Sequence, residues 1–422
     1  MQLFDKDNWI EITHTVKQNK LRSFLTAFGI FWGIFLLMVM LGAGTGLENG
    51  AMEDYSRYAT NSVFIWARKT TIPYKGFPRG RKYYLSNEDT LALRQNIPEI
   101  AYLAPRNQLG GYRDVNNVTR GLKNGAYNIY GDYPEFIHIK KMDITAGRFI
   151  NKLDMKERRK VAVIGERVLS VLFNADEDPI GKYIRIKGVF FKVVGVFKTD
   201  SEGDKAEEET QTIFVPFTTF QKTFNYGNRV SWYSITSKQG ISVSIVEKKV
   251  IALLSQRHKI SPKDTFAFGK ENIEKDYLKI VNLFVGIHAL IWFVGVCTLL
   301  AGVIGVSNIM LIIVKERTKE IGIKRAIGAT PLNILSQIMT ESLLLTVSAG
   351  YFGLFAGVGF IELISHIMVV SKSNIDYFEN PEINLSIAAT ALFILIVSGV
   401  LSGLIPGHKA VSIKPVEAIR EA

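Results

Sequence analysis

Four long apolar runs divide the chain, and polar stretches of unequal length separate them. A helix rises about 1.5 Å per residue, so about 20 apolar residues cross a hydrocarbon core of about 30 Å. Each run reaches that length, which predicts transmembrane helices at residues 22–47, 280–314, 331–368 and 383–406. The second run carries no Asp, Glu, Lys or Arg from Asn282 to Val314 and exceeds a bilayer's thickness. We therefore expect its helix to continue outward as a stalk.

Residues 48–279 lie between the first two runs and predict a folded domain rather than a loop. Strand, helix and strand patterns follow one another near its start and again near its end, so 55–105 and 228–275 predict one β-α-β subdomain. Residues 106–227 predict a β-rich subdomain inserted between those halves, with a loop over the acidic stretch 199–210. The expected fold class is membrane α-helical, with four transmembrane helices and a large α+β extracytoplasmic domain of two subdomains inserted between helices 1 and 2.

Charged residues beside the apolar runs predict which side of the membrane each end occupies. Basic residues precede the first run and acidic ones follow it, namely Lys17, Lys20 and Arg22, then Glu48, Glu53 and Asp54. Basic residues favour the cytoplasmic side, so both termini, including the tail 407–422, are predicted to be cytoplasmic, and the short loop 369–382 is predicted to lie outside. Residues 1–21 predict an amphipathic helix on the inner membrane surface, an ordinary tail being the alternative.

Residues 315–330, called the coupling segment below, place dense charge between the second and third runs. Glu316, Glu320 and Lys324 follow one another at four-residue spacing, so they lie along one helical face. Gly328 is suited to end that helix, and Pro331 to begin the next. The pattern predicts a short cytoplasmic helix presented to a partner. The alternative is a positively charged loop that only orients the chain.

Candidate coupling residues combine charge that orients docking with small or apolar side chains that allow close packing into a partner's groove. They are Glu316, Arg317, Glu320, Ile321, Gly322, Lys324, Arg325, Ala326 and Gly328. Glu341 falls just inside the third run, where an acid is a functional candidate, and a side chain that extends to the interface is the alternative.

Glycines recur in pairs at four-residue spacing in the membrane runs, and such pairs permit close approach of two helices. The candidate helix-packing residues are Gly29 and Gly33, Gly42 and Gly46, Gly353 and Gly357, and Gly399 and Gly403. Four helices enclose little by themselves, so we expect a dimer.

Composition excludes several classes of function. Hydrophobic residues make up 47% and charged residues 21%, which suits a part-membrane protein, and much of the net charge of +12 borders the membrane runs rather than forming a nucleic-acid surface. Cys297 is the single cysteine, and no His, Cys, Asp and Glu cluster has metal spacing, so we expect no metal. The sequence lacks a G-x-x-x-x-G-K-[ST] phosphate loop and a G-x-S-x-G elbow, so no catalytic residue and no bound cofactor are predicted.

Four stretches together resemble the MacB/FtsX-like permeases of ABC transporters, the macrolide-exporter type. Residues 19–30 resemble the family's entry to its first helix, and residues 316–329 resemble its coupling helix. The family's periplasmic core domain is resembled by residues 147–149, 161–165, 178–182 and 193–196. Its C-terminal signature is resembled by residue 406 with 410–420. The resemblance covers nearly the whole chain, in order.

The resemblance implies a permease of the bacterial inner membrane that hydrolyses no ATP itself. A separate cytoplasmic ABC ATPase, carrying ATP and magnesium, would dock on the coupling helix, and the second helix would carry its motion to the periplasmic domain. A second permease chain, identical or not, completes the transporter. Three functions stay open: export with a periplasmic adaptor and an outer-membrane channel, which we favour; lipoprotein extraction; and signalling to cell-wall hydrolases. The sequence does not identify the substrate.

Overall fold

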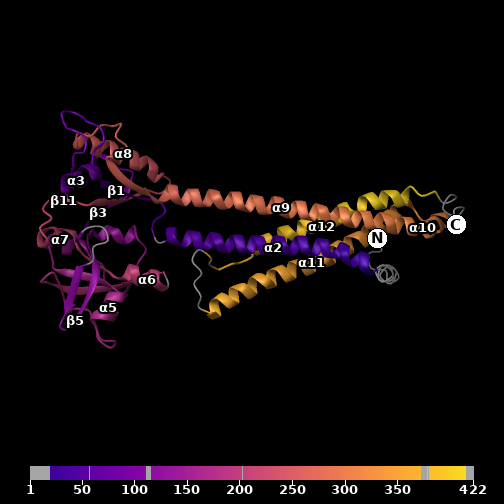
Figure 1. Ribbon diagram of the computed structural model, residues 1–422, viewed down its shortest axis with the longest axis horizontal. Coiled ribbons are helices and arrows are strands. Elements are labelled where there is room, and N and C mark those ends of the chain that lie inside the picture. The colour runs from indigo at the N-terminus through magenta and orange to yellow at the C-terminus, as the bar shows by residue number, and fades with distance from the viewer. Residues whose placement is uncertain are drawn as a thin grey trace. The chain divides into compact units, whose positions relative to one another are not determined.

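The computed structural model describes residues 20–56, 58–110, 116–201, 203–371, 378 and 380–414. The amphipathic helix predicted at residues 1–21 falls almost wholly outside these residues, as do residues 415–420 of the C-terminal signature. The chain divides into two compact units (Figure 1): a membrane unit, Met1–Ala51 with Val281–Ala422, and an outer domain, Met52–Ile280.

The membrane unit contains the four predicted transmembrane helices. They are α2 (Lys20–Ser56), α9 (Ile273–Glu316), α11 (Pro331–Ser371) and α12 (Leu385–Val411), each long and apolar enough to cross a membrane. A short helix, α10 (Thr318–Ala326), follows α9. Helix α9 has 44 residues and therefore spans about 66 Å, more than twice the hydrocarbon core of about 30 Å. It is one unbroken helix that begins in the outer domain and ends beside α10.

The outer domain contains a four-stranded antiparallel sheet built from both ends of its sequence. Its elements are β1 (Ser62–Ala67), α3 (Asn87–Asn96), β3 (Ile100–Gln108), β12 (Trp232–Ser237), α8 (Val243–Arg257) and β13 (Phe268–Asn272). The strands pair in the order β3-β12-β1-β13, which gives two β-α-β units, as predicted. A capping box between Ser86 and Asp89 starts α3. Val63, Tyr233 and Leu254 are fully buried in its core.

Between these halves the chain forms a closed ring of six strands. They are β4 (Asn116–Arg120), β5 (Lys123–Asp132), β7 (Val161–Gly165), β8 (Tyr183–Ile186), β9 (Val189–Lys198) and β10 (Thr212–Pro216). The ring closes because β10 pairs with both β5 and β7. Gly188, at a φ of +86°, makes the turn of the β8–β9 hairpin, and Ile164, Phe191 and Val193 fill the interior.

Shorter elements complete the outer domain. They are β2 (Leu85–Ser86), the 3₁₀ helix η1 (Pro134–His138), β6 (Asp143–Gly147), α4 (Lys152–Glu157), α5 (Glu166–Leu172), α6 (Gly203–Thr210), α7 (Phe217–Thr223) and β11 (Arg229–Val230). Strand β6 pairs with β9, and β2 pairs with β11.

Helix α6 corrects the loop predicted at residues 199–210. The Thr199 hydroxyl donates to Glu209 at 2.6 Å, and Lys140 Nζ lies 3.4 Å from the same carboxylate. Thr210 Oγ1 donates to the Ala206 carbonyl at 2.6 Å within the helix. The acidic stretch forms a helix without apolar periodicity because a cation and a hydroxyl elsewhere in the fold contact it.

Candidate coupling site

The predicted coupling helix is present as α10, with a distinct break on each side. Arg317, between α9 and α10, has φ −95° and ψ 12°, and the Thr318 hydroxyl donates to the Lys315 carbonyl at 2.7 Å. After α10, Gly328 adopts a φ of +110°, a conformation that strongly favours glycine. Pro331 then opens α11. Local sequence therefore sets both ends of the helix.

An ion pair ties the start of α10 to α11. Arg317 Nη1 donates to Glu341 Oε1 at 3.1 Å, and the two side chains are 18% and 5% exposed. Glu341 is thus buried and paired, and does not extend to the interface. Within α10, Glu320 lies 3.8 Å from Arg317 Nε and 3.2 Å from Lys324 Nζ. These exposed pairs stabilise the helix only slightly, whereas the buried pair fixes its position.

The end of α10 is tied to α12. Arg325 Nη1 donates to the backbone carbonyls of Val411, at 2.7 Å, and Ile413, at 2.5 Å. Val411 is the last residue of α12, where carbonyls have no partner within the helix, and Ile413 lies two residues beyond it, so the guanidinium binds the chain at and just after the helix end. Helix α10 is therefore held by α11 at its start and by α12 at its end.

Ile321 and Gly322 correct the prediction that they pack into a partner's groove. Ile321 is 5% exposed and Gly322 is buried, both within this chain. The exposed apolar face consists instead of Ile323, at 42%, Ala326, and Ile327, at 82%. Hydrophobicity alone could not distinguish the two faces of so short a helix.

An open depression of about 340 Å³ adjoins this exposed face. It is lined by Lys324, Ile327, Ala329, Asn333, Ile334 and Gln337. The last three belong to the first two turns of α11, whose contribution the sequence did not indicate. Glu316 and Gly328 are exposed nearby. The exposed surface of α10 and the start of α11 is therefore a mostly apolar patch with charge at its margin.

Seven of the eight predicted helix-packing glycines lie against another element of the membrane unit. A Cβ at Gly353 would lie 2.5 Å from the Phe31 carbonyl oxygen, and one at Gly357 would lie 2.6 Å from Met38 Cβ. Helix α11 thus approaches α2 more closely than a side chain would allow. Gly29 is the exception, because no atom of another element would lie within 4 Å of its Cβ.

The remaining predicted glycines lie against other parts of the membrane unit. Their nearest neighbours are Leu299 and Thr298 for Gly33, Ile361 for Gly42, Phe378 and Pro381 for Gly46, Leu343 for Gly399, and Met339 for Gly403. The prediction missed Gly295, where a Cβ would lie 2.5 Å from Leu37, and Gly407, where it would lie 2.6 Å from Leu335. Gly295 has no glycine four residues away, whereas Gly407 continues the spacing of Gly399 and Gly403 just past residue 406, where the predicted fourth helix ends.

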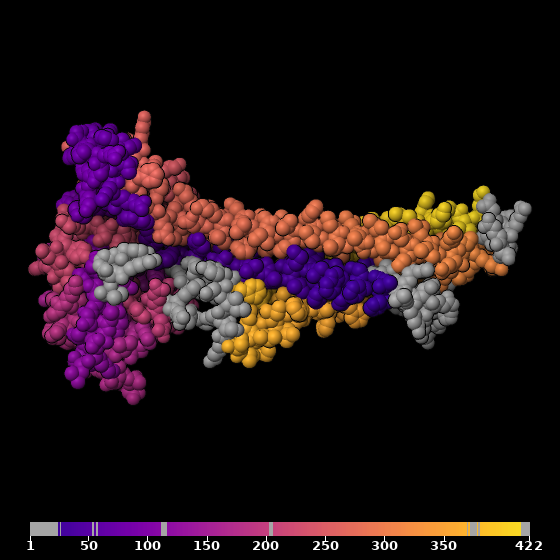
Figure 2. All heavy atoms as spheres, viewed as in Figure 1, coloured from indigo at the N-terminus to yellow at the C-terminus, as the bar shows by residue number. Residues whose placement is uncertain are grey.

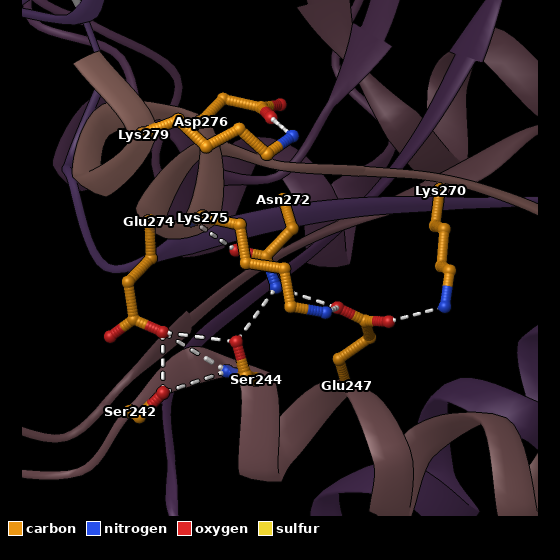
Figure 3. A network of polar contacts seen from close by, with 9 residues as sticks. All are labelled: Ser242, Ser244, Glu247, Lys270, Asn272, Glu274, Lys275, Asp276 and Lys279. Atoms are coloured by element: carbon orange, nitrogen blue, oxygen red, sulfur yellow. Dashed lines mark hydrogen bonds and ion pairs between the residues drawn. The ribbon is translucent and has the colours of Figure 1, made fainter. Parts of the chain in front are cut away.

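At its other end, α9 is bonded to α8 of the outer domain (Figure 3). Glu274, in the first turn of α9, accepts hydrogen bonds from the hydroxyl of Ser242 at 2.5 Å and of Ser244 at 3.2 Å. It also accepts the Ser244 backbone N–H at 3.2 Å. This carboxylate therefore caps the N-terminus of α8, where negative charge is stabilised.

A second carboxylate, Glu247 of α8, reaches back to the start of α9. It accepts from Asn272 Nδ2 at 2.6 Å and from the ammonium groups of Lys270 at 2.7 Å and Lys275 at 3.4 Å. Burial would raise the pKa of Glu247, but the hydrogen bonds from Lys270 and Asn272 outweigh it and hold the pKa below its usual range. The paired carboxylates join α8 and α9 firmly.

No group of three or more His, Cys, Asp and Glu residues is arranged to hold a metal in the part of the chain that the structure describes. Cys297 is a free, exposed thiol in α9.

Two family models match the chain. The MacB-like periplasmic core domain matches residues 23–253, more than half of the chain, and the FtsX-like permease C-terminal domain matches residues 292–415. The two matches together cover most of the chain, and residues 254–291, which include the start of α9, lie between them.

Relatives that are longer than this chain match it over nearly its whole length. The macrolide export ATP-binding/permease protein MacB of Bdellovibrio bacteriovorus is 29% identical over 96% of this chain and 60% of its own length. The pyoverdine export ATP-binding/permease protein PvdT of Pseudomonas syringae pv. syringae is also 29% identical, over 95% of this chain and 57% of its own length. The chain thus spans about three fifths of these relatives.

Among solved structures, the periplasmic region of MacB from Actinobacillus actinomycetemcomitans covers 55% of this chain at 19% identity, with a TM-score of 0.43. The extracellular domain of YknZ from Gram-positive bacteria covers 50% at 16% identity, with a TM-score of 0.41. These likenesses are weak, and the assignment rests on the sequence models. The chain belongs to the MacB/FtsX-like family of ABC transporter permeases, multi-pass membrane proteins with a periplasmic domain.

Proposed function

We propose that this chain is the permease of an ABC-type exporter, in which an ATPase docks on α10 and moves the outer domain through α9. The observation that carries the proposal is the continuity of α9. Its first turn is bonded to α8 through Glu274, and its last turn leads directly into α10. An unbroken helix transmits displacement along its axis better than a flexible linker.

The docking surface in this proposal is the apolar patch around Ile323, Ala326 and Ile327. Large exposed apolar side chains beside a depression favour burial against a partner. Residues 1–422 contain no phosphate-binding loop, so in this proposal the ATPase that docks on α10 binds the ATP and magnesium.

Movement would spread from α10 through its two ties. Displacing α10 pulls on α11 through Arg317 and Glu341, and on α12 through Arg325. The close glycine contacts pass the displacement from α11 to α2, because tightly packed helices shift as units. A second permease chain would face this one across the ATPase pair.

Export is favoured over the other two functions because the relatives are named for export of macrolides and of pyoverdine. We propose that a periplasmic adaptor and an outer-membrane channel complete a tripartite system. The alternatives, lipoprotein extraction and signalling to cell-wall hydrolases, make different predictions about what binds the outer domain.

The test is affinity purification of the full chain from native membranes in mild detergent, followed by mass spectrometry. Recovery of an ABC ATPase with a periplasmic adaptor supports the exporter. An ATPase with lipoproteins and no adaptor favours extraction, and an ATPase with a cell-wall hydrolase favours signalling. Repeated absence of any ATPase would contradict the proposal as a whole.

A further inference from the structure

A cavity of about 510 Å³ is lined entirely by residues of the outer domain, none of which belongs to α9 or the coupling segment. One wall comes from the end of β1 and the chain before β2, and the other from the residues around β11. Its volume falls in the range of small-molecule pockets, about 300–1,000 Å³. The residues that decide its chemistry are Arg68, Lys69, Lys82, Arg229, Tyr84 and Tyr226.

Four of those residues are cations for which the described residues supply no carboxylate partner. No ion pair links Arg68, Lys69, Lys82 or Arg229 to a described Asp or Glu, and the described lining of the cavity contains no acidic residue. The excess is built into the sequence, because residues 67–87 contain Arg68, Lys69, Lys75, Arg79, Arg81 and Lys82 but no acidic residue. This segment includes the dark purple lobe that projects from the outer domain in Figure 2.

Clustered like charges repel one another and raise the local potential. Ion pairs are common elsewhere in the same domain, as at Arg106 with Asp132 and Arg148 with Asp154, so carboxylates are not scarce there. An unneutralised group of four cations around one cavity is therefore suited to receive an anion, which would relieve the repulsion.

Aromatic rings supply the second feature of the cavity. Tyr84 is 54% exposed, and the Arg229 guanidinium carbon lies 4.2 Å from the centre of its ring. The Tyr226 hydroxyl donates to the Gln108 carbonyl at 2.5 Å, and the neighbouring Tyr83 hydroxyl donates to Ala267 at 2.5 Å. These bonds hold the rings of Tyr226 and Tyr83, and the Arg229 guanidinium stacks on Tyr84, so a planar ligand would meet aromatic surface on both walls.

We propose that this cavity binds a small anionic molecule that carries a planar aromatic or conjugated group. The cations would pair with its acidic groups, while Tyr84 and Tyr226 contact its plane. The same charge would repel a cationic compound. That the bound anion is cargo rests on the proposed export function; the binding itself does not.

Pyranine, a planar trisulfonated pyrene, is a suitable probe. Proflavine, which is also planar and aromatic but carries a positive charge, is the control ligand. We expect fluorescence anisotropy of pyranine to show saturable, salt-sensitive binding to the full chain in detergent, and proflavine to show none. Removing a charge-assisted contact typically weakens binding about ten-fold. R68Q/K82Q should therefore weaken pyranine binding about 100-fold, and Y84A several-fold.

The matched control is R185Q/K187Q, which removes two exposed cations from the β8–β9 hairpin. It should change affinity less than two-fold. Equal loss in both double variants would overturn the proposal, because binding would then reflect net charge alone. Binding of polyglutamate without pyranine binding would also overturn it, in favour of an extended acidic partner. I323D/I327D should leave pyranine binding intact, so failure of ATPase docking and failure of this site are distinguishable.

Discussion

Arg317 Nη1 lies 3.1 Å from Glu341 Oε1, so the residue that separates α9 from α10 is bonded to the third turn of α11, 24 positions later. The pair is largely buried, and both partners border a membrane helix. It makes α10 an attached part of the helical unit rather than a free loop, which is what a docking element needs in order to pass on force.

We expect E341Q to destabilise the permease by about 3 kcal/mol, because it replaces the buried carboxylate that faces Arg317 by a neutral amide. The charge swap R317E/E341R should recover part of that loss, since the pair can form in reverse. Unfolding by SDS in mixed micelles measures the stability of both variants relative to the unmodified chain. If E341Q were as stable as the unmodified chain, the pair would have no positioning role.

Gly322 and Ala326 are four residues apart in α10, but Gly322 is buried within this chain whereas Ala326 is exposed. G322W should lower the thermal stability of the permease itself, because the ring has to enter space that this chain already fills. A326W should leave stability unchanged and reduce the ATPase recovered with the permease about ten-fold. Thermal unfolding and quantitative pull-down separate the two effects, and identical behaviour of the two variants would contradict the assigned faces.

The junction of α8 and α9 gives a third prediction. E274A removes the acceptor of three hydrogen bonds at the start of α8, each worth about 1.5–3 kcal/mol because the acceptor is charged. Hydrogen exchange at the first turn of α8 should rise at least ten-fold. D276A, in the same turn of α9, removes only an exposed bond to Lys279 and serves as control. Unchanged exchange in E274A would mean that the junction does not depend on this carboxylate.

Asp89 predicts how the outer domain responds to acid. Burial would raise its pKa, but hydrogen bonds from His258 and Arg257 lower the pKa to about 2. A carboxyl of lowered pKa stabilises the fold above its unfolded pKa of about 3.9 and loses that contribution as pH falls toward 2. The shift corresponds to about 2–3 kcal/mol.

Calorimetry of the full chain between pH 5 and pH 2.5 checks this. D89N should lower the outer domain's stability at pH 5 and flatten its dependence on pH in that window. D176N, at an exposed carboxyl, should do neither. An unchanged pH profile in D89N would show that another group controls the acid response.

Much of the architecture was predictable because it depends on local patterns. Uninterrupted apolar runs give the four helices, Ser86 and Asp89 signal the start of α3, and Gly188 marks a hairpin turn. The predicted glycine pairs at Gly353 and Gly399 lie at close helix contacts, since small residues are what close approach requires.

The missed features depend on tertiary contacts. Nothing near Arg325 in sequence indicates that it binds the last carbonyls of α12, more than 80 residues later. Helix α6 forms in a stretch without apolar periodicity because Lys140 and Thr199 contact its acid Glu209. The orientation of Ile321 and Gly322 was wrong for the same reason: which face of α10 is buried depends on α11 and α12.

The central claim is that an ATPase docks on the exposed face of α10. The most direct measurement is the amount of ABC ATPase recovered with the full chain from native membranes, compared between the unmodified chain and I323D/I327D. We expect near-stoichiometric ATPase with the unmodified chain and at least ten-fold less with the variant, at equal permease stability. Equal recovery with both, or no ATPase with either, would contradict the account.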